Sequence, residues 1–311
     1  EGKRKFDYGT IMIPTGIQKE KADTLQKILD IIARDDAIRV YALSSGASSD
    51  GIDLGSPGFE PVPLPRVMLV VGTGVSSTDV GEAWHLLDYR FNMEVSLVET
   101  QALGRADLNR YTTIAMSNGI YTSIDSAGTA AIKRWVENGG TLITMERAAE
   151  WAVNNNIATA RFRKLEPGRR DSTVLRRPYA EQSRYSGAMN LDGAIFEVTG
   201  DRTHPLLFGY DEDRFSVFRG NAIFMDPSRN AYATPLVYTR TPLLSGYMHR
   251  DFEPLVRNSA AIIVSTLRSG RVILMTDNPN FRAFWYGTNR LFLNSIFFDS
   301  IIRQSTVRAE E

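Results

Sequence analysis

The feature that most constrains the fold is a regular alternation of apolar strands and amphipathic helices from Arg66 onward. Strands are predicted at 66–72, 95–100, 112–119 and 141–145, with helices between most of them. This alternation is typical of a mostly parallel sheet that is covered by helices on both faces. We therefore predict an α/β fold with an open sheet for residues 66–311.

Two helices of this region have clear sequence signals. The helix after the first strand carries Val80, Trp84, Leu87 and Phe91 on its predicted inner stripe, and Ser76 or Ser77 is expected to cap its start. The helix before 141–145 is expected to begin at Ser123 or Asp125 and to end at the Gly-Gly pair 139–140.

The second half of the chain alternates less regularly. An irregular insertion is predicted at about 157–193, and its stretch 161–177 holds seven basic residues against two acidic ones. Further strands are predicted at 193–198 and 221–225, a hairpin-linked strand pair at 260–277, and a final helix at 287–302.

Residues 1–65 are expected to form a separate N-terminal part. Strands are predicted at 8–14 and 38–43, on either side of a helix at 21–36, and a Gly- and Pro-rich connector follows at 44–65. One strand–helix–strand unit buries too little surface to fold alone. We expect it to pack on the main sheet or on a domain outside this chain.

Composition excludes several kinds of chemistry. The 311 residues contain no cysteine, which excludes disulfides, thiolate metal sites and thiol nucleophiles. The formal net charge is zero, so no general attraction to nucleic acid is expected. No apolar run approaches the roughly 18 residues that a membrane span requires. The chain begins Glu1-Gly2-Lys3, from which we expect a mature form or an excised piece.

Three weak motifs favour structural roles. Gly72 and Gly74 fit a dinucleotide-binding loop, but Ser77 replaces its third glycine, so a capped turn is the preferred interpretation. His85 in "HLLD" lacks a second group of metal ligands. His204 precedes a proline, which favours an extended loop position, and we interpret it as part of a turn.

Polar residues follow the predicted strands, where open α/β sheets form their ligand crevices. The stretch "GGTLITMERAAEW" places Glu146 at a strand-to-helix corner, the position of a nucleophile in many α/β enzymes. A pair between Glu146 and Arg147 and a pair between Asp277 and Arg282 are the structural alternatives. The residues of a possible pocket are Ser117, Asn118, Gly119, Arg147, Asp277, Asn280 and Arg282.

The order of elements from 66 to 299 resembles the class I glutamine amidotransferase-like, flavodoxin-like fold. "YTTIAMSNG", a helix and "WVENGGTLITMERAA" resemble that family's approach to its nucleophile. Glu146 occupies the cysteine position, and "TDNPNFR" stands where the family's histidine and glutamate follow a late strand. The resemblance therefore implies the fold without amidotransferase activity.

A second resemblance covers nearly the whole chain. "FDYGTIMIP", "VYALSSG", "GTGVSSTDVGEAWHLLDYRF", "THPLLFGY" and "NPNFRAFWYGTNRLFLN" resemble, in this order, the segment after the peptidase domain of large exported bacterial zinc carboxypeptidases. This resemblance implies an exported bacterial parent whose zinc site lies in a peptidase domain outside these residues. No cofactor is expected in the chain itself.

We therefore expect a non-catalytic accessory region whose partner is its own peptidase domain. The basic stretch 161–177, with Arg169, Arg170, Arg176 and Arg177, is the expected docking surface. Two alternatives remain open, namely a module that binds a peptide or small polar ligand at the sheet edge, and a weak hydrolase that uses Glu146. A raised pKa of Glu146 in a cleft would favour the hydrolase.

Overall fold

The computed structural model describes residues 4–48, 50–164, 178–191 and 193–303. The chain divides into two compact units, Glu1–Val62 and Pro63–Glu311. Within the described residues, no helix is long and apolar enough to cross a membrane.

The first unit contains helices but no strand among its described residues. A 3-10 helix, η1 (Thr15–Lys21), leads into α1 (Ala22–Asp35). The strands predicted at 8–14 and 38–43 are wrong, because Tyr8 and Gly9 form a turn and neither segment pairs with a strand. Two short strands beside one helix lack the third strand or covering layer that a stable sheet needs. The helix itself is confirmed, although none of its residues is fully buried.

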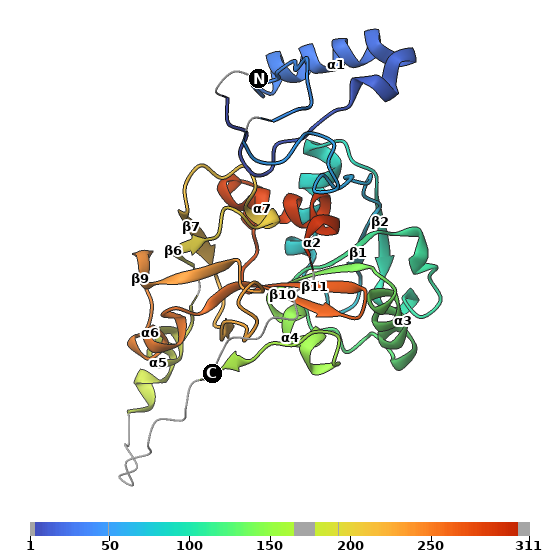
Figure 1. The fold of residues 1–311 in the computed structure, drawn as a ribbon. Helices are drawn as coiled ribbons and strands as arrows, with labels where there is room; N and C mark the ends of the chain where they lie inside the picture. Colours follow the sequence, from blue (N-terminus) through green and yellow to red (C-terminus); the bar gives the residue numbers. More distant parts are fainter. Residues whose placement is uncertain (1–3, 49, 165–177, 192, 304–311) are drawn as a thin grey trace. The chain divides into compact units, whose positions relative to one another are not determined.

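The second unit is built on one large mixed sheet in the order β2-β1-β3-β4-β11-β10-β9-β6-β7 (Figure 1). Its parallel half consists of β2 (Val95–Glu99), β1 (Val67–Val71), β3 (Thr113–Met116), β4 (Thr141–Met145) and β11 (Gly270–Met275). With β11 as the fifth strand, this is the 2-1-3-4-5 order of flavodoxin-like folds. The predicted α/β class is confirmed.

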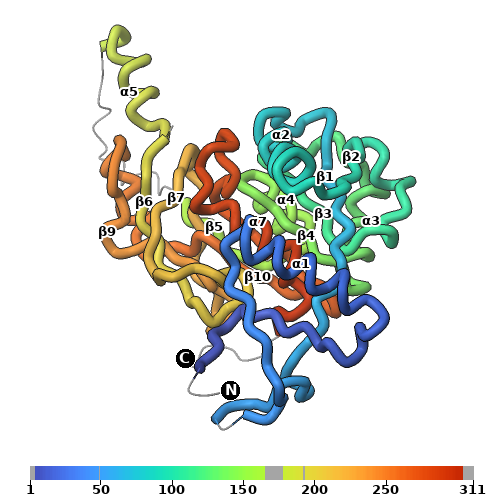
Figure 2. Tube along the Cα trace, turned by 90° about the horizontal axis from the view of Figure 1, so that it is seen from above, coloured from blue at the N-terminus to red at the C-terminus, as the bar shows by residue number. Residues whose placement is uncertain are grey.

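Helices cover both faces of the parallel half, as the strand sequences require. In β1, Val67 and Leu69 face one core and Met68 and Val70 face the other, so the strand is apolar throughout. The first core receives α2 (Ser77–Trp84) and α7 (Tyr286–Phe297), and the second receives α3 (Ser126–Glu137) and α4 (Arg147–Asn154). Figure 2 shows the same elements from above.

The other half of the sheet is antiparallel, which the sequence analysis did not predict. It comprises β10 (Ala260–Leu267), β9 (Leu236–Gly246), β6 (Ala194–Gly200) and β7 (Arg214–Arg219). The short strands β5 (Phe162–Arg163) and β8 (Phe224–Met225) pair beside β10. The hairpin of β10 and β11 is confirmed, whereas β7 and β9 were missed and 221–225 contributes only two strand residues.

The inner stripe predicted after β1 is half wrong. Val80 and Leu87 are buried, but Trp84 is 42% exposed and Phe91 is 48% exposed. The cause is a change of helix type, since α2 continues as a π-helix, η2 (His85–Arg90). The wider turn changes the phase of the helix and directs Leu86 and Leu87 toward the core.

Part of the predicted irregular insertion has regular structure. Besides β5, it contains η5 (Tyr179–Glu181) and α5 (Gln182–Ala188). Residues 165–177, which hold most of the basic stretch and its four arginines proposed for docking, lie outside the described residues. The remaining short helices are η3 (Thr100–Ala102), η4 (Leu108–Arg110), η6 (Pro205–Leu207), η7 (Arg250–Phe252), α6 (Glu253–Val256), η8 (Phe281–Ala283) and η9 (Asp299–Ile301).

The turn between α3 and β4 depends on the absence of a side chain at Gly140. A Cβ atom there would lie 2.4 Å from the Trp135 ring, which is 5% exposed. We predict that Gly140→Ala lowers the unfolding free energy by about 1–3 kcal/mol, as overpacking does. Gly81→Ala on α2 is the matched control, because its Cβ meets nothing within 4 Å. Equal urea midpoints for the two variants would contradict this account.

Candidate functional site

Glu146 lies at the corner between β4 and α4, next to the end of β11. Its backbone has φ 53° and ψ −120°, a left-handed conformation that is rare for a residue with a side chain. Its N–H donates to the Met275 carbonyl at 2.8 Å, which ties the corner to β11. The strained strand-to-helix bend expected of a nucleophile position is therefore present.

The Glu146 carboxyl is held in its protonated form. Its pKa is raised to about 8, chiefly by burial and in addition by the nearby carboxylates of Asp79 and Asp277, while Arg219 and a hydrogen bond with Asn221 oppose the shift. At neutral pH most molecules therefore carry a neutral acid at the corner. A neutral carboxyl can donate a proton, but it is a poor nucleophile.

The expected contact between Glu146 and Arg147 does not form. Arg147 is exposed, and among the described residues no ion pair joins it to Glu146. Arg147 is the first residue of α4, and Glu146 precedes the helix with a non-helical backbone conformation.

The charged group beside Glu146 is Arg219, at the end of β7. Its side chain is 0% exposed and forms an ion pair with Asp277 at 2.9 Å. It also donates to the Tyr238 hydroxyl at 2.5 Å and to the Asn221 carbonyl at 3.1 Å. Tyr238 of β9 in turn donates to the other oxygen of Asp277. Several N–H donors of the fully buried Arg219 guanidinium therefore have hydrogen-bond partners.

Asp277 therefore pairs with a residue that the sequence did not suggest. The predicted pair with Arg282 is wrong, since Arg282 is exposed, its backbone N–H donates to Glu82 at 2.7 Å, and its guanidinium lies 5.3 Å from the Phe281 ring centroid. Burial raises the pKa of Asp277, and the Arg219 guanidinium and the Tyr238 hydroxyl oppose that shift. The loop turns away after Asp277, and Arg282 itself has φ 49°.

A second buried acid, Glu82 of α2, holds the loop that follows β11. Glu82 is 7% exposed, accepts from the Asn278 side chain at 2.6 Å and from the Arg282 backbone at 2.7 Å. Asn278 also donates to Asp79 at 3.2 Å. Burial raises the pKa of Glu82. The loop is fastened to α2 and does not open a crevice there.

The loops after β1 and β3 are also closed against each other. The Ser76 N–H donates to the Asn118 carbonyl at 2.9 Å, and the Ile120 N–H donates to the Gly74 carbonyl at 2.7 Å. A Cβ on Gly74 would lie 2.1 Å from the Ile120 oxygen. Flavodoxin-like sheets bind ligands at this switch point between β1 and β3. In this protein, the backbone of the two loops occupies that switch point.

The other predicted pocket residues do not converge on a hollow. Ser117 and Asn280 are each 1% exposed, and Gly119 packs against Gly74. Asn280 is bonded to Asn289 at 3.4 Å. A cavity of about 20 Å³ lies beside Asp277 and Asn278, which is room for a single water. In the described part of the chain, the predicted set is a packed edge, with only Arg147 and Arg282 exposed.

No histidine is among the groups that shift the pKa of Glu146. His85 stacks on Tyr89 with ring centroids 5.0 Å apart, while His204 and His249 cap η6 and η7 through their Nδ1 atoms. Burial lowers the pKa of His204 to about 4. Within the described ranges, no group of three or more His, Asp or Glu side chains is arranged to hold a metal ion.

Sequence reasoning missed Arg219, Tyr238 and Glu82. Strand signals for the first two exist, because "RFSVFR" and "LVYTRT" are rich in aromatic and β-branched residues. Their pairing with Asp277 was not visible, since it joins residues far apart in the chain. Glu82 carries no local signal beyond its position beside the apolar stripe of α2.

Fold and site together define an α/β protein of the class I glutamine amidotransferase-like fold whose nucleophile corner carries glutamate. No family model matches the chain, and no curated protein matches its sequence. The chain is similar to a ThuA-like protein from Parabacteroides merdae, with a TM-score of 0.50 and 12% identity over 79% of this chain and 93% of that one. A ThuA-like protein from Bacteroides uniformis has a TM-score of 0.49 and 14% identity over 82% and 98%. At these identities the likeness concerns the fold alone.

Arg219→Met should be strongly destabilising, because it leaves Asp277 buried without its cation. We expect a loss of about 3–5 kcal/mol in unfolding free energy, measured by urea denaturation. Arg214→Met on the same strand is the control, since Arg214 is 65% exposed and lies 3.9 Å from Glu197. Its cost should stay below about 0.5 kcal/mol. Similar losses for both variants would contradict the role given to Arg219.

Glu146→Gln should change how stability depends on pH. The pKa of Glu146 is about 8 in the folded protein, against an ordinary 4.5, so the folded state holds the proton more tightly. Its contribution to stability is complete below pH 4.5 and is lost as the pH rises to 8. Relative to the native protein, the unfolding free energy of the variant should therefore rise by up to about 1.4 kcal/mol per pH unit between pH 4.5 and pH 8.

Unfolding free energies at pH 5, 6.5, 8 and 9 test this prediction, with the exposed Glu94→Gln as control. The difference between Glu146→Gln and the native protein should grow up to pH 8 and then level off. A difference that stays constant from pH 5 to pH 9 would show that Glu146 is ionised at neutral pH.

Proposed function

We propose that the chain is a non-catalytic accessory region of an exported bacterial zinc carboxypeptidase, with a structural or interaction role. The observation that carries the proposal is the buried group formed by Arg219, Asp277 and Tyr238. It occupies the end of β11, where the amidotransferase fold would place its histidine and acid. At the facing corner, cysteine is replaced by the protonated Glu146.

The motif resemblance along the chain supports the choice of parent. By this resemblance, catalytic zinc would be bound by the peptidase domain; the described residues contain no group of three or more His, Asp or Glu side chains placed to hold a metal ion. The partner of the region is then the peptidase domain of its own chain, and the location of the parent is extracytoplasmic. The closed loops after β1 and β3 favour this role over a sheet-edge binding module.

A second candidate function rests on Glu146 itself. Its positive φ and its pKa of about 8 are properties that catalytic acids share. A weak hydrolase would use the neutral carboxyl as a proton donor. Glu146 lines neither the cavity of about 20 Å³ beside Asp277 nor a cavity of about 220 Å³ beside Glu150.

The test compares three proteins, namely the full-length product of the complete reading frame, the same protein without these 311 residues, and the 311-residue chain alone. We expect the isolated chain to leave peptides and amides intact, with or without added zinc. Removing the region should lower the melting temperature of the parent or change its substrate range.

Two outcomes would contradict the proposal. A reading frame that encodes no metallopeptidase domain would eliminate the parent. Hydrolysis by the isolated chain that Glu146→Gln abolishes, and that the matched Glu94→Gln leaves intact, would replace the accessory role with the hydrolase.

A further inference from the structure

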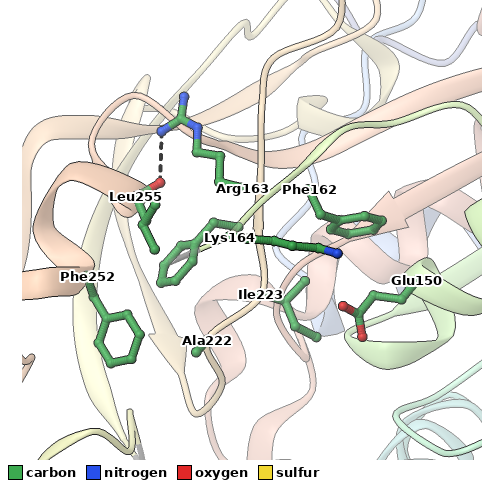
Figure 3. A pocket seen from close by; sticks show the side chains of 9 residues that line it. Glu150, Phe162, Arg163, Lys164, Ala222, Ile223, Phe252 and Leu255 are labelled. Atoms are coloured by element: carbon green, nitrogen blue, oxygen red, sulfur yellow. Dashed lines mark hydrogen bonds between the residues drawn. The ribbon is translucent and has the colours of Figure 1, made fainter. Parts of the chain in front are cut away.

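A pocket of about 220 Å³ lies outside the candidate site. It is formed where β5 and β8 meet α4 and the segment η7–α6, and none of the strand-end residues discussed above lines it (Figure 3). A volume of this size has room for about seven water molecules, taking ~30 Å³ for each. It suits a small molecule better than a polymer.

One wall of the pocket is aromatic and fixed. Phe224 is 1% exposed and Phe252 is 3% exposed, with ring centroids 5.9 Å apart. Phe162, Leu255 and Ile223 extend the apolar lining. Phe224 cannot swing freely, because the Arg219 guanidinium lies 4.5 Å from its ring centroid. The wall is thus pre-formed, as small-molecule sites usually are.

The opposite end of the pocket carries two charges of opposite sign. Glu150 of α4 and Lys164 after β5 both line it, and their side chains point toward each other in Figure 3. Among the described residues no ion pair within 4.0 Å joins them. Arg163 also lines the pocket, but it pairs with Asp226 at 2.6 Å and donates to the Leu255 and Arg257 carbonyls.

We propose that this pocket binds a free α-amino acid with an apolar side chain of about the size of leucine or phenylalanine. Lys164 would bind the carboxylate and Glu150 the ammonium group. The side chain would lie against the half-buried Phe162, Ile223 and Leu255, beside the buried rings of Phe224 and Phe252. A zwitterion matches both charges at once, whereas a lone anion or cation leaves one of them without a partner.

The inference goes beyond the proposed accessory role and does not depend on it. Titration calorimetry of the 311-residue chain with L-phenylalanine and L-leucine should detect binding. N-acetyl-L-phenylalanine lacks the ammonium group and phenethylamine lacks the carboxylate, so each should bind about 10- to 100-fold more weakly, the cost of one charge-assisted bond. Glycine, which lacks the apolar side chain, should also bind more weakly.

Two variants assign the ends of the ligand. Glu150→Gln should weaken the binding of L-phenylalanine about 10-fold or more but leave that of N-acetyl-L-phenylalanine unchanged. Lys164→Met should weaken the binding of L-phenylalanine by a similar factor but leave that of phenethylamine unchanged. Lys133→Met and Glu94→Gln, which do not line the pocket, are the controls. Absence of binding to either amino acid at 10 mM, on the order of the weakest affinity of interest, would overturn the proposal. Binding that both pocket variants leave intact would overturn it too.

Discussion

The structure depends on one buried ion pair, between Arg219 and Asp277. Arg219 ends β7 in the antiparallel half of the sheet, and Asp277 follows β11 in the parallel half, so the pair joins the two. Removing two charges from water costs several kcal/mol per ion, and the cost is offset only when the remaining donors and acceptors are satisfied. Tyr238 and the carbonyls of the 221–223 loop supply those partners.

The same pair contributes to the protonation state of Glu146, whose pKa is raised chiefly by burial. The Arg219 charge is shared between Asp277 and the corner carboxyl, and Asp277 is bound to it directly at 2.9 Å. Glu146 is left half-buried beside further negative charge, so retaining its proton is less costly than ionising. A corner that would expose a nucleophile in an enzyme therefore holds a neutral acid. The bend has the backbone geometry of a nucleophile corner, but at neutral pH its carboxyl lacks the negative charge that a nucleophile needs.

The sequence predicts those parts of the fold that local patterns encode. The parallel strands are continuous apolar runs, and Asp125 and Ser76 cap their helices as ordinary N-caps do. In the antiparallel half, β9 was missed because it contains Pro242 and its register with β6 is irregular. The partner of Asp277 was predicted wrongly for a related reason. A local partner, Arg282, was chosen for Asp277, whereas the actual partner comes from a strand 58 positions away.

The segment 219–224 both closes the edge of the sheet at the strand ends and forms part of the pocket beside Glu150. The 219–224 segment places Arg219 and Asn221 against Asp277 and Glu146, and its next residues, Ala222 to Phe224, form the pocket. Glu150 lies one turn of α4 beyond Glu146, so the same helix contributes to both. A strand end that is closed by a salt bridge need not leave the protein without a binding surface. The contacts of Arg219 and Asn221 at the strand ends also hold Ala222 to Phe224 in the positions that shape the pocket.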